Sequence, residues 1–179
     1  MSTITTLINN LSQSEAQTIL HALVKNDPEL TQRITELASQ QLTGVDTEAV
    51  AAEVYAGLDA LTREEVWDRA GDTRDGYVET GEAADEMIDE VITPWQAEIT
   101  RYQTIGLQME ATLTCMAVLQ GIHQFATESA NPFKEWAGDS LPVYADEVVH
   151  TWRKGEPDEG DVAELCEFVL EELGGWVQV

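Results

Sequence analysis

Residues 107–127 read LQMEATLTCMAVLQGIHQFAT and carry a single formal charge, that of Glu110, in a chain whose net charge is −25. Apolar residues recur along one side with a helical period, and others fill much of the opposite side. They are Leu107, Met109, Ala111, Leu113, Cys115, Met116, Val118, Leu119, Ile122 and Phe125. A helix that is apolar over most of its circumference is buried on most sides. We therefore expect residues 107–126 to form a central buried helix.

This apolar stretch is not expected to cross a membrane, because several of its side chains would be costly in lipid: Gln108, Thr112, Thr114, Gln120, His123 and Gln124. The first ten residues, MSTITTLINN, contain no basic region and no long apolar run, so no signal peptide is expected. Cys115 and Cys166 lie on apolar helix faces, which favours reduced, packed cysteines. These features predict a cytoplasmic protein.

The other periodic segments are also helical, and we find no convincing pair of strands. Capping boxes begin helices at Ser12 with Glu15 and at Thr62 with Glu65, and Asp46 is a further N-cap. Residues 71–77, GDTRDGY, are the clearest turn cluster. A break or sharp kink is expected between Thr93 and Pro94, since proline inside a helix costs about 3 kcal/mol. The sequence thus predicts an all-α fold of eight to ten helices, packed as successive antiparallel hairpins around the helix at 107–126.

Charge divides the chain into two parts. Four acids and two bases give residues 1–43 a net charge of −2, so residues 44–179 carry the remaining −23 of the total. Asp27-Pro28 is an N-cap with proline at the first helical position, which predicts a helical hairpin within residues 1–43. We expect this N-terminal hairpin to pack on an acidic all-α body, residues 44–179, within one compact domain.

The acid excess limits the possible partners. It repels nucleic acid and anionic membrane, and it attracts cations or a basic protein surface. Eleven acids fall between Glu64 and Glu90 against two arginines, Arg69 and Arg74, and the densest group predicts a partner-binding surface at Asp85, Glu86, Asp89 and Glu90. The alternative is that the acids serve only solubility or solvation at high salt.

The segment at about 92–125 resembles one unit of a tetratricopeptide repeat. Trp95, Tyr102, Gly106 and Glu110-Ala111 have the spacing of that family's large residues, turn glycine and small packing residue. The segment departs from the family at Ile99, where a small residue is usual, and at His123, where proline is usual. No second copy follows at a 34-residue period. The resemblance implies peptide or protein binding, and the alternative is an ordinary antiparallel helix pair.

An enzymatic alternative rests on carboxylates spaced three residues apart. Such pairs leave one helix face together, and two pairs on facing helices could hold Mg²⁺ against a triphosphate. The pattern resembles that of the all-α nucleoside triphosphate pyrophosphatases, with Asp68 where a glutamate is usual. The resemblance implies a Mg²⁺-dependent phosphohydrolase whose metal ligands would be Glu64, Glu65, Asp68, Glu82, Asp85, Glu86 and Asp89. In a chain this acidic, a solvated face gives the same pattern.

Three weaker patterns favour structural interpretations. Asp75-Gly76 with Glu82 resembles the second half of an EF-hand loop, but Gly71 stands at its first ligand position, so high-affinity calcium binding is not expected. We expect Arg69 and Arg74 to pair with the neighbouring Asp68, Asp72 or Asp75. One Glu-x-x-His motif, Glu147 to His150, lacks the second copy that a di-iron bundle needs, because Gln120 precedes His123.

The stretch from Trp67 to Tyr77 also resembles segments of uncharacterised helical proteins of prokaryotes, a resemblance that implies no activity. We conclude from the sequence that the chain is a non-enzymatic interaction or scaffold protein without a cofactor, with the Mg²⁺-dependent phosphohydrolase as the alternative. The sequence does not indicate an oligomeric state.

Overall fold

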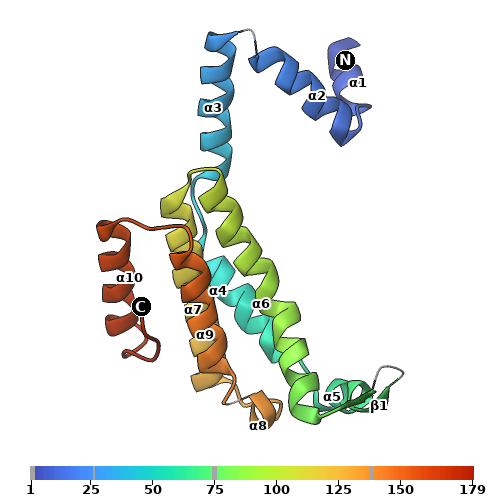
Figure 1. Ribbon diagram of the computed structural model, residues 1–179, viewed down its shortest axis with the longest axis vertical. Coiled ribbons are helices and arrows are strands. Elements are labelled where there is room, and N and C mark those ends of the chain that lie inside the picture. The colour runs from blue at the N-terminus through green and yellow to red at the C-terminus, as the bar shows by residue number, and fades with distance from the viewer. Residues whose placement is uncertain (1–2, 26, 74–75, 138) are drawn as a thin grey trace. The chain divides into compact units, whose positions relative to one another are not determined.

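The computed structural model describes residues 3–25, 27–73, 76–137 and 139–179 (Figure 1). In these residues the chain forms ten helices and one small sheet, so the fold is all-α as the sequence predicts. Contacts within the backbone divide the chain into two compact units, Met1–Thr43 and Gly44–Val179. We call them the N-terminal unit and the body.

The N-terminal unit contains α1 (Thr3–Asn9), α2 (Gln13–Val24) and α3 (Pro28–Leu42). The capping box of α2 is present as predicted, because the Ser12 side chain accepts the Glu15 N–H while the Glu15 carboxylate accepts the Ser12 N–H at 2.9 Å. Asp27 caps α3 by accepting the Leu30 N–H at 3.0 Å. The side-chain oxygens of Ser12 and Asp27 therefore determine where α2 and α3 begin.

The body is built around α7 (Gln108–Glu128), which packs against α4 (Thr47–Asp59), α6 (Thr80–Thr104), α9 (Leu141–Arg153) and α10 (Glu159–Glu171) (Figure 1). Two short helices, α5 (Arg63–Arg69) and α8 (Lys134–Ala137), complete it. Twelve of the 21 residues of α7 are buried. The predicted central helix is confirmed, with bounds that differ by one or two residues.

Helices α4 and α7 approach closely at Gly121. A Cβ atom at this position would lie 2.6 Å from the backbone oxygen of Ala51 and 2.7 Å from Val54 Cβ. Ala51, Val54 and Gly121 are all buried. Glycine is therefore needed on α7 because the backbone of α4 occupies the place of a side chain.

Buried polar groups join α6, α7 and α9 near one end. The Trp152 indole N–H donates to the Thr112 hydroxyl at 3.0 Å, and that hydroxyl donates to the Gln108 carbonyl at 3.0 Å. The amide groups of Gln103 and Gln108 donate to the carbonyls of Trp152 and Gly155, at 2.6 and 2.7 Å. These bonds satisfy polar groups that would be costly to bury alone.

The expectation that the chain has no strand pair is wrong. Strands β1 (Gly71–Thr73) and β2 (Gly76–Val78) pair antiparallel, with Gly71 opposite Val78 and Asp72 opposite Tyr77. Gly71 and Gly76 have φ of +103° and +140°, which suits glycine. The predicted turn cluster is thus a short hairpin, and Arg74 and Asp75 lie outside the described residues.

Of the break or sharp kink expected at Thr93-Pro94, the break is wrong, and the kink stays a prediction. Helix α6 is continuous over 25 residues with Pro94 inside it. The helix buries Ile88 and Ile92 before the proline and Ile99 after it. Burial of apolar side chains on both sides offsets the hydrogen bond that proline removes.

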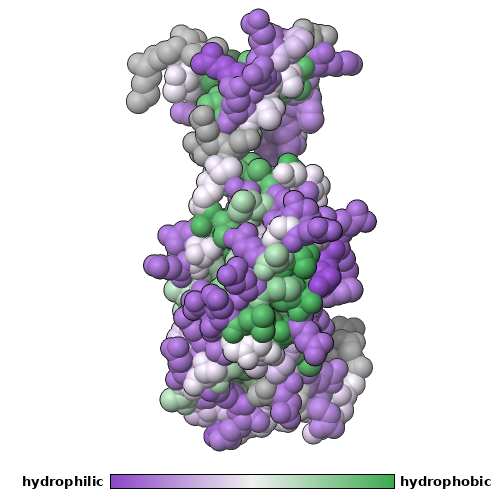
Figure 2. Space-filling model, turned by 90° about the vertical axis from the view of Figure 1, so that its left-hand side faces the viewer, coloured by the Kyte–Doolittle hydropathy of each residue, from purple (hydrophilic) through white to green (hydrophobic). Residues whose placement is uncertain are grey.

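Most acids of the described residues lie outside the core, but Glu110 is only 7% exposed. On the face of the body drawn in Figure 2, polar side chains surround a band of apolar ones. Among the described residues, no helix combines the length and the apolar character needed to cross a membrane.

Candidate functional site

The candidate site is the outer face of α6. Its inner face buries Ala83, Ala84, Met87, Ile88 and Ile92, which recur with the period of a helix. This period leaves Glu86, Asp89 and Glu90 exposed, while Asp85 is half-buried. The four carboxylates of the predicted partner-binding surface therefore lie in one region of α6. Three of them point outward, and the fourth, Asp85, is partly covered.

The exposed carboxylates line a shallow hollow. Glu86, Asp89, Glu90, Thr93 and Pro94 surround about 430 Å³ of open space. Because Pro94 has no N–H, the Glu90 carbonyl lacks the helical donor that another residue at position 94 would supply. The hollow is thus rich in hydrogen-bond acceptors, and such a surface suits donor groups that carry positive charge.

One positive side chain reaches this surface from α5. Arg69 donates two hydrogen bonds to the Glu90 carboxylate, at 2.7 and 2.9 Å. This pairing raises the pKa of Arg69, with the charges of Glu65 and Glu86 adding to the effect, and it lowers the pKa of Glu90. The expectation that Arg69 pairs with Asp68 or Asp72 is wrong, because its partner comes from the next helix.

Two carboxylates of the hollow remain available. Among the described residues, neither Glu86 nor Asp89 forms an ion pair or a side-chain hydrogen bond. An isolated group of like charges is mildly destabilising, so a cation that approaches it relieves repulsion as well as gaining attraction. Within the described residues, the negative charge of this surface is therefore only partly neutralised.

Helix α9 extends the acidic surface. The Tyr144 hydroxyl donates to the Asp85 carbonyl at 2.8 Å. Burial raises the pKa of Tyr144, and the negative charges of Asp89, Asp85 and Glu147 raise it further. Glu147 therefore lies close enough to act on the same hydroxyl. Sequence reasoning did not place Glu147 in this group, because only the packing of α9 against α6 brings it there.

The seven carboxylates of the phosphohydrolase alternative do not form a metal centre. No group of three or more Asp, Glu, His or Cys side chains among the described residues is arranged to hold a metal ion. Asp85 is half-buried, and the other six are exposed: Glu64, Glu65, Asp68, Glu82, Glu86 and Asp89. The cation that bonds across α5 and α6 is the guanidinium of Arg69.

The Glu-x-x-His motif and its glutamine counterpart lie on α9 and α7, and Glu147 is their one member near the α6 surface. Glu147 and His150 are exposed, and Gln120 and His123 are half-buried. The His123 ring meets the Trp176 ring edge to face, with centroids 5.4 Å apart. The EF-hand interpretation depends in part on Asp75, outside the described residues.

The residues of the tetratricopeptide resemblance lie on the α6–α7 hairpin. Trp95 and Tyr102 are half-buried, Ala111 is fully buried, and Gly106 has a φ of +78°. The turn between the two helices thus uses glycine in a left-handed conformation. The resemblance itself stays a prediction.

An exposed aromatic group was missed by sequence reasoning. Trp67 is 57% exposed and meets Trp136 edge to face at 6.0 Å between ring centroids. The Arg63 guanidinium lies 5.4 Å from the Trp136 ring centroid and pairs with Glu135. The two tryptophans are 69 positions apart in sequence, so no local pattern could have joined them.

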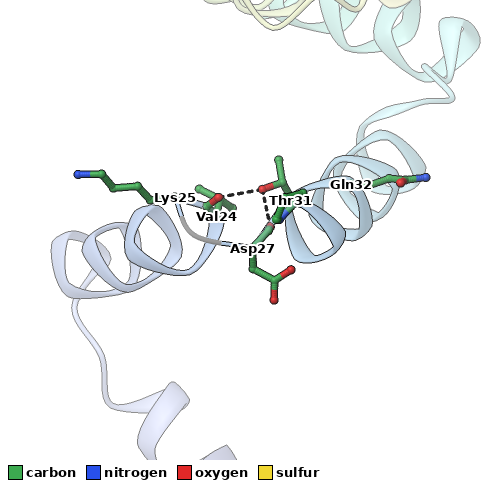
Figure 3. A pocket seen from close by; sticks show the side chains of 6 residues that line it. Val24, Lys25, Asp27, Thr31 and Gln32 are labelled. Carbon is green, nitrogen blue, oxygen red and sulfur yellow. Dashed lines mark hydrogen bonds between the residues drawn. The ribbon is translucent and has the colours of Figure 1, made fainter.

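A second hollow lies in the N-terminal unit, at the turn between α2 and α3 (Figure 3). The Thr31 hydroxyl lies 2.9 Å from the carbonyls of both Val24 and Asp27 and bonds the two helix ends together. The side chains of Lys25 and Gln32 point in opposite directions. The hollow follows from the turn and does not gather polar groups around one point.

Comparison with known proteins gives no further indication of function. No family model, no curated protein sequence and no solved structure matches this chain.

Proposed function

We propose that the chain is a non-enzymatic interaction protein that binds a basic protein surface through the acidic hollow of α6. One observation carries the proposal: the carboxylates of Glu86 and Asp89 line this hollow beside Glu90, and neither has an ion-pair partner among the described residues. Lysine or arginine side chains supply both the charge and the donors that these acceptors lack. The solubility interpretation requires only that acids be exposed, and it does not require them to gather beside a backbone carbonyl that proline leaves without its helical donor.

The expected association is fast and sensitive to salt. A body with a net charge of −23 attracts a basic partner over long distances, and salt screens this attraction beyond about 8–10 Å. A carboxylate that receives a charge-assisted hydrogen bond in the complex contributes more than one that is only near the partner. The residues of the hollow should therefore matter more than acids elsewhere.

The test compares two variants that remove equal charge. The first replaces Asp85 and Asp89 with asparagine and Glu86 and Glu90 with glutamine. The control replaces four acids of α10 and its C-cap with glutamine: Glu164, Glu167, Glu171 and Glu172, all exposed. Affinity for a lysine- and arginine-rich peptide is measured by fluorescence anisotropy at low and at physiological salt. Tryptophan fluorescence checks that each body is folded.

The α6 variant should bind about tenfold more weakly than the parent, or worse, while the α10 variant changes affinity by roughly threefold or less. Equal weakening by both variants would show that only total charge matters, and the proposal would be abandoned. The same three proteins can then serve as baits in native lysate at low and high salt, to identify the natural partner. Cytoplasmic location stays a prediction from the sequence.

A further inference from the structure

Within its described residues, the N-terminal unit forms no core of its own. Among its side chains that the structure describes, in residues 5–25, 27–38 and 42–43, none is buried. Six large apolar side chains, which we call the N-terminal apolar set, are 43–60% exposed: Leu7, Ile8, Ile19, Leu20, Leu23 and Leu37. Between α2 and α3 they continue into an apolar groove lined by Leu20, Val24 and Ile34.

Helices this short are marginally stable in water unless a partner covers their apolar side chains. The three helices have 7, 12 and 15 residues, and isolated helices shorter than about 12–15 residues are marginal in water. The cap at Ser12 and the bonds of Thr31 set the turns of the unit, as Figure 3 shows for the second turn. They do not remove apolar surface from water. An additional apolar partner is therefore required.

We propose that the partner is the N-terminal unit of a second copy of this chain. The charge distribution favours contact through this unit, because it carries only −2 while each body carries −23. Two bodies repel each other, so association is least costly where the chain is nearly neutral. The contact would be isologous, each copy presenting the same residues of α2 and α3 to the other.

The body also exposes apolar side chains, among them the band that polar side chains surround in Figure 2, but its net charge of −23 opposes contact between two bodies. Its six large exposed apolar side chains are spread over 136 residues, on five elements and the turn after α6: Trp67, Tyr77, Ile105, Met109, Val143 and Leu170. Scattered single residues of this kind are normal on protein surfaces. The N-terminal unit concentrates the same number in 43 residues, so its best apolar complement within this chain is itself.

The available area is enough for a weak specific dimer. A fully exposed Leu or Ile side chain corresponds to about 60–120 Å² at 25 cal/mol per Å², so six that are half exposed leave about 300 Å² per copy. Because roughly 57–65% of an interface is apolar, an interface that buries the N-terminal apolar sets of both copies covers about 1,000 Å² in total. This is the lower limit for a specific contact, a size at which association is usually weak and transient.

The test measures the mass of the full chain by sedimentation equilibrium from about 1 to 200 μM. One variant carries Leu20→Glu and Leu23→Glu. The matched control carries Thr18→Glu and Ala22→Glu, which add the same charge at exposed positions on the polar side of α2. Far-UV circular dichroism follows helix content over the same concentrations. All five tryptophans lie in the body, so their fluorescence shows separately whether the body is folded.

The parent mass should rise from 19.8 kDa towards twice that value, with helix content rising in parallel. The Leu20/Leu23 variant should weaken association about tenfold or more, and the control should associate like the parent. A parent that stays monomeric at all concentrations overturns the proposal. The N-terminal apolar set would then be covered by the chain's own body or by a different protein. Equal association of the parent and the Leu20/Leu23 variant also overturns it.

Discussion

Replacement of Gly121 by alanine tests the closest approach in the body. The added Cβ would lie 2.6 Å from the Ala51 oxygen and 2.7 Å from Val54 Cβ, whereas ordinary contact begins at 3.4 Å. Helix α4 would have to move away by about 0.8 Å, and a gap of that size forfeits roughly a quarter to a half of the dispersion energy of each affected contact. Because Ala51 contributes a backbone atom, no side-chain rotation relieves the clash.

Two effects of opposite sign determine the result. Alanine is favoured over glycine in a helix by about 1 kcal/mol. Overpacking in a core costs about 1–3 kcal/mol, and contact with a rigid backbone places this site near the upper value. The free energy of unfolding of Gly121→Ala should therefore fall by about 2 kcal/mol.

Two other helical glycines give matched controls. Gly81 has nothing within 4 Å of its Cβ position, so Gly81→Ala should stabilise the chain by about 0.5–1 kcal/mol. At Gly57 the added Cβ meets Val91 Cγ1 at 2.9 Å, a side-chain atom that can move, so Gly57→Ala should have an effect near zero. Urea unfolding followed by tryptophan fluorescence measures all three. If Gly121→Ala is as stable as the parent while Gly81→Ala is more stable, the close packing of α4 on α7 is refuted.

Three further predictions concern α6 and the cysteines. Pro94→Ala should raise the free energy of unfolding by about 1–3 kcal/mol, because an N–H is restored opposite the Glu90 carbonyl; decreased stability in urea would contradict this. The bond from Arg69 lowers the pKa of Glu90 from its ordinary 4.5, so the pair's stabilisation is present above pH 4.5 and is lost as pH falls through the lowered pKa. The stability difference between parent and Glu90→Gln should therefore shrink in acid, and an equal difference at about pH 3 and pH 7 would exclude the pairing. Cys115 is fully buried with a raised pKa, while Cys166 is half-buried. A thiol reagent should therefore modify Cys166 in the native chain and Cys115 only after denaturation. Rapid reaction of both cysteines in the native chain would contradict the structure.

The parts of the fold that follow from local chemistry could be predicted from the sequence. The apolar period of residues 107–126 predicted α7, and the capping boxes at Ser12 and Thr62 predicted the starts of two helices, as the structure confirms. Each of these signals acts within a few residues. The hairpin at Gly71 was missed because strands of three residues are too short to show a period of two.

Features that depend on packing could not be predicted in the same way. At Pro94 the local preference for a break was real, but burial of Ile92 and Ile99 held the helix together. The partner of Arg69 lies 21 residues away on the next helix. In the candidate site, the outward spacing of Glu86, Asp89 and Glu90 follows from helical geometry, whereas the contribution of Glu147 depends on where α9 packs.

The contact between α4 and α7 also has a consequence for the newly synthesised chain. About 70 residues separate Ala51 from Gly121, so the ribosome completes α4 well before its main partner exists. At about 5–20 residues per second, the apolar side of α4 waits roughly 4–14 seconds for that partner. Ala51, Val54 and Leu58 form this side and become fully covered only in the finished body. During this interval α4 is a natural target for chaperones that hold exposed apolar helices on translating ribosomes.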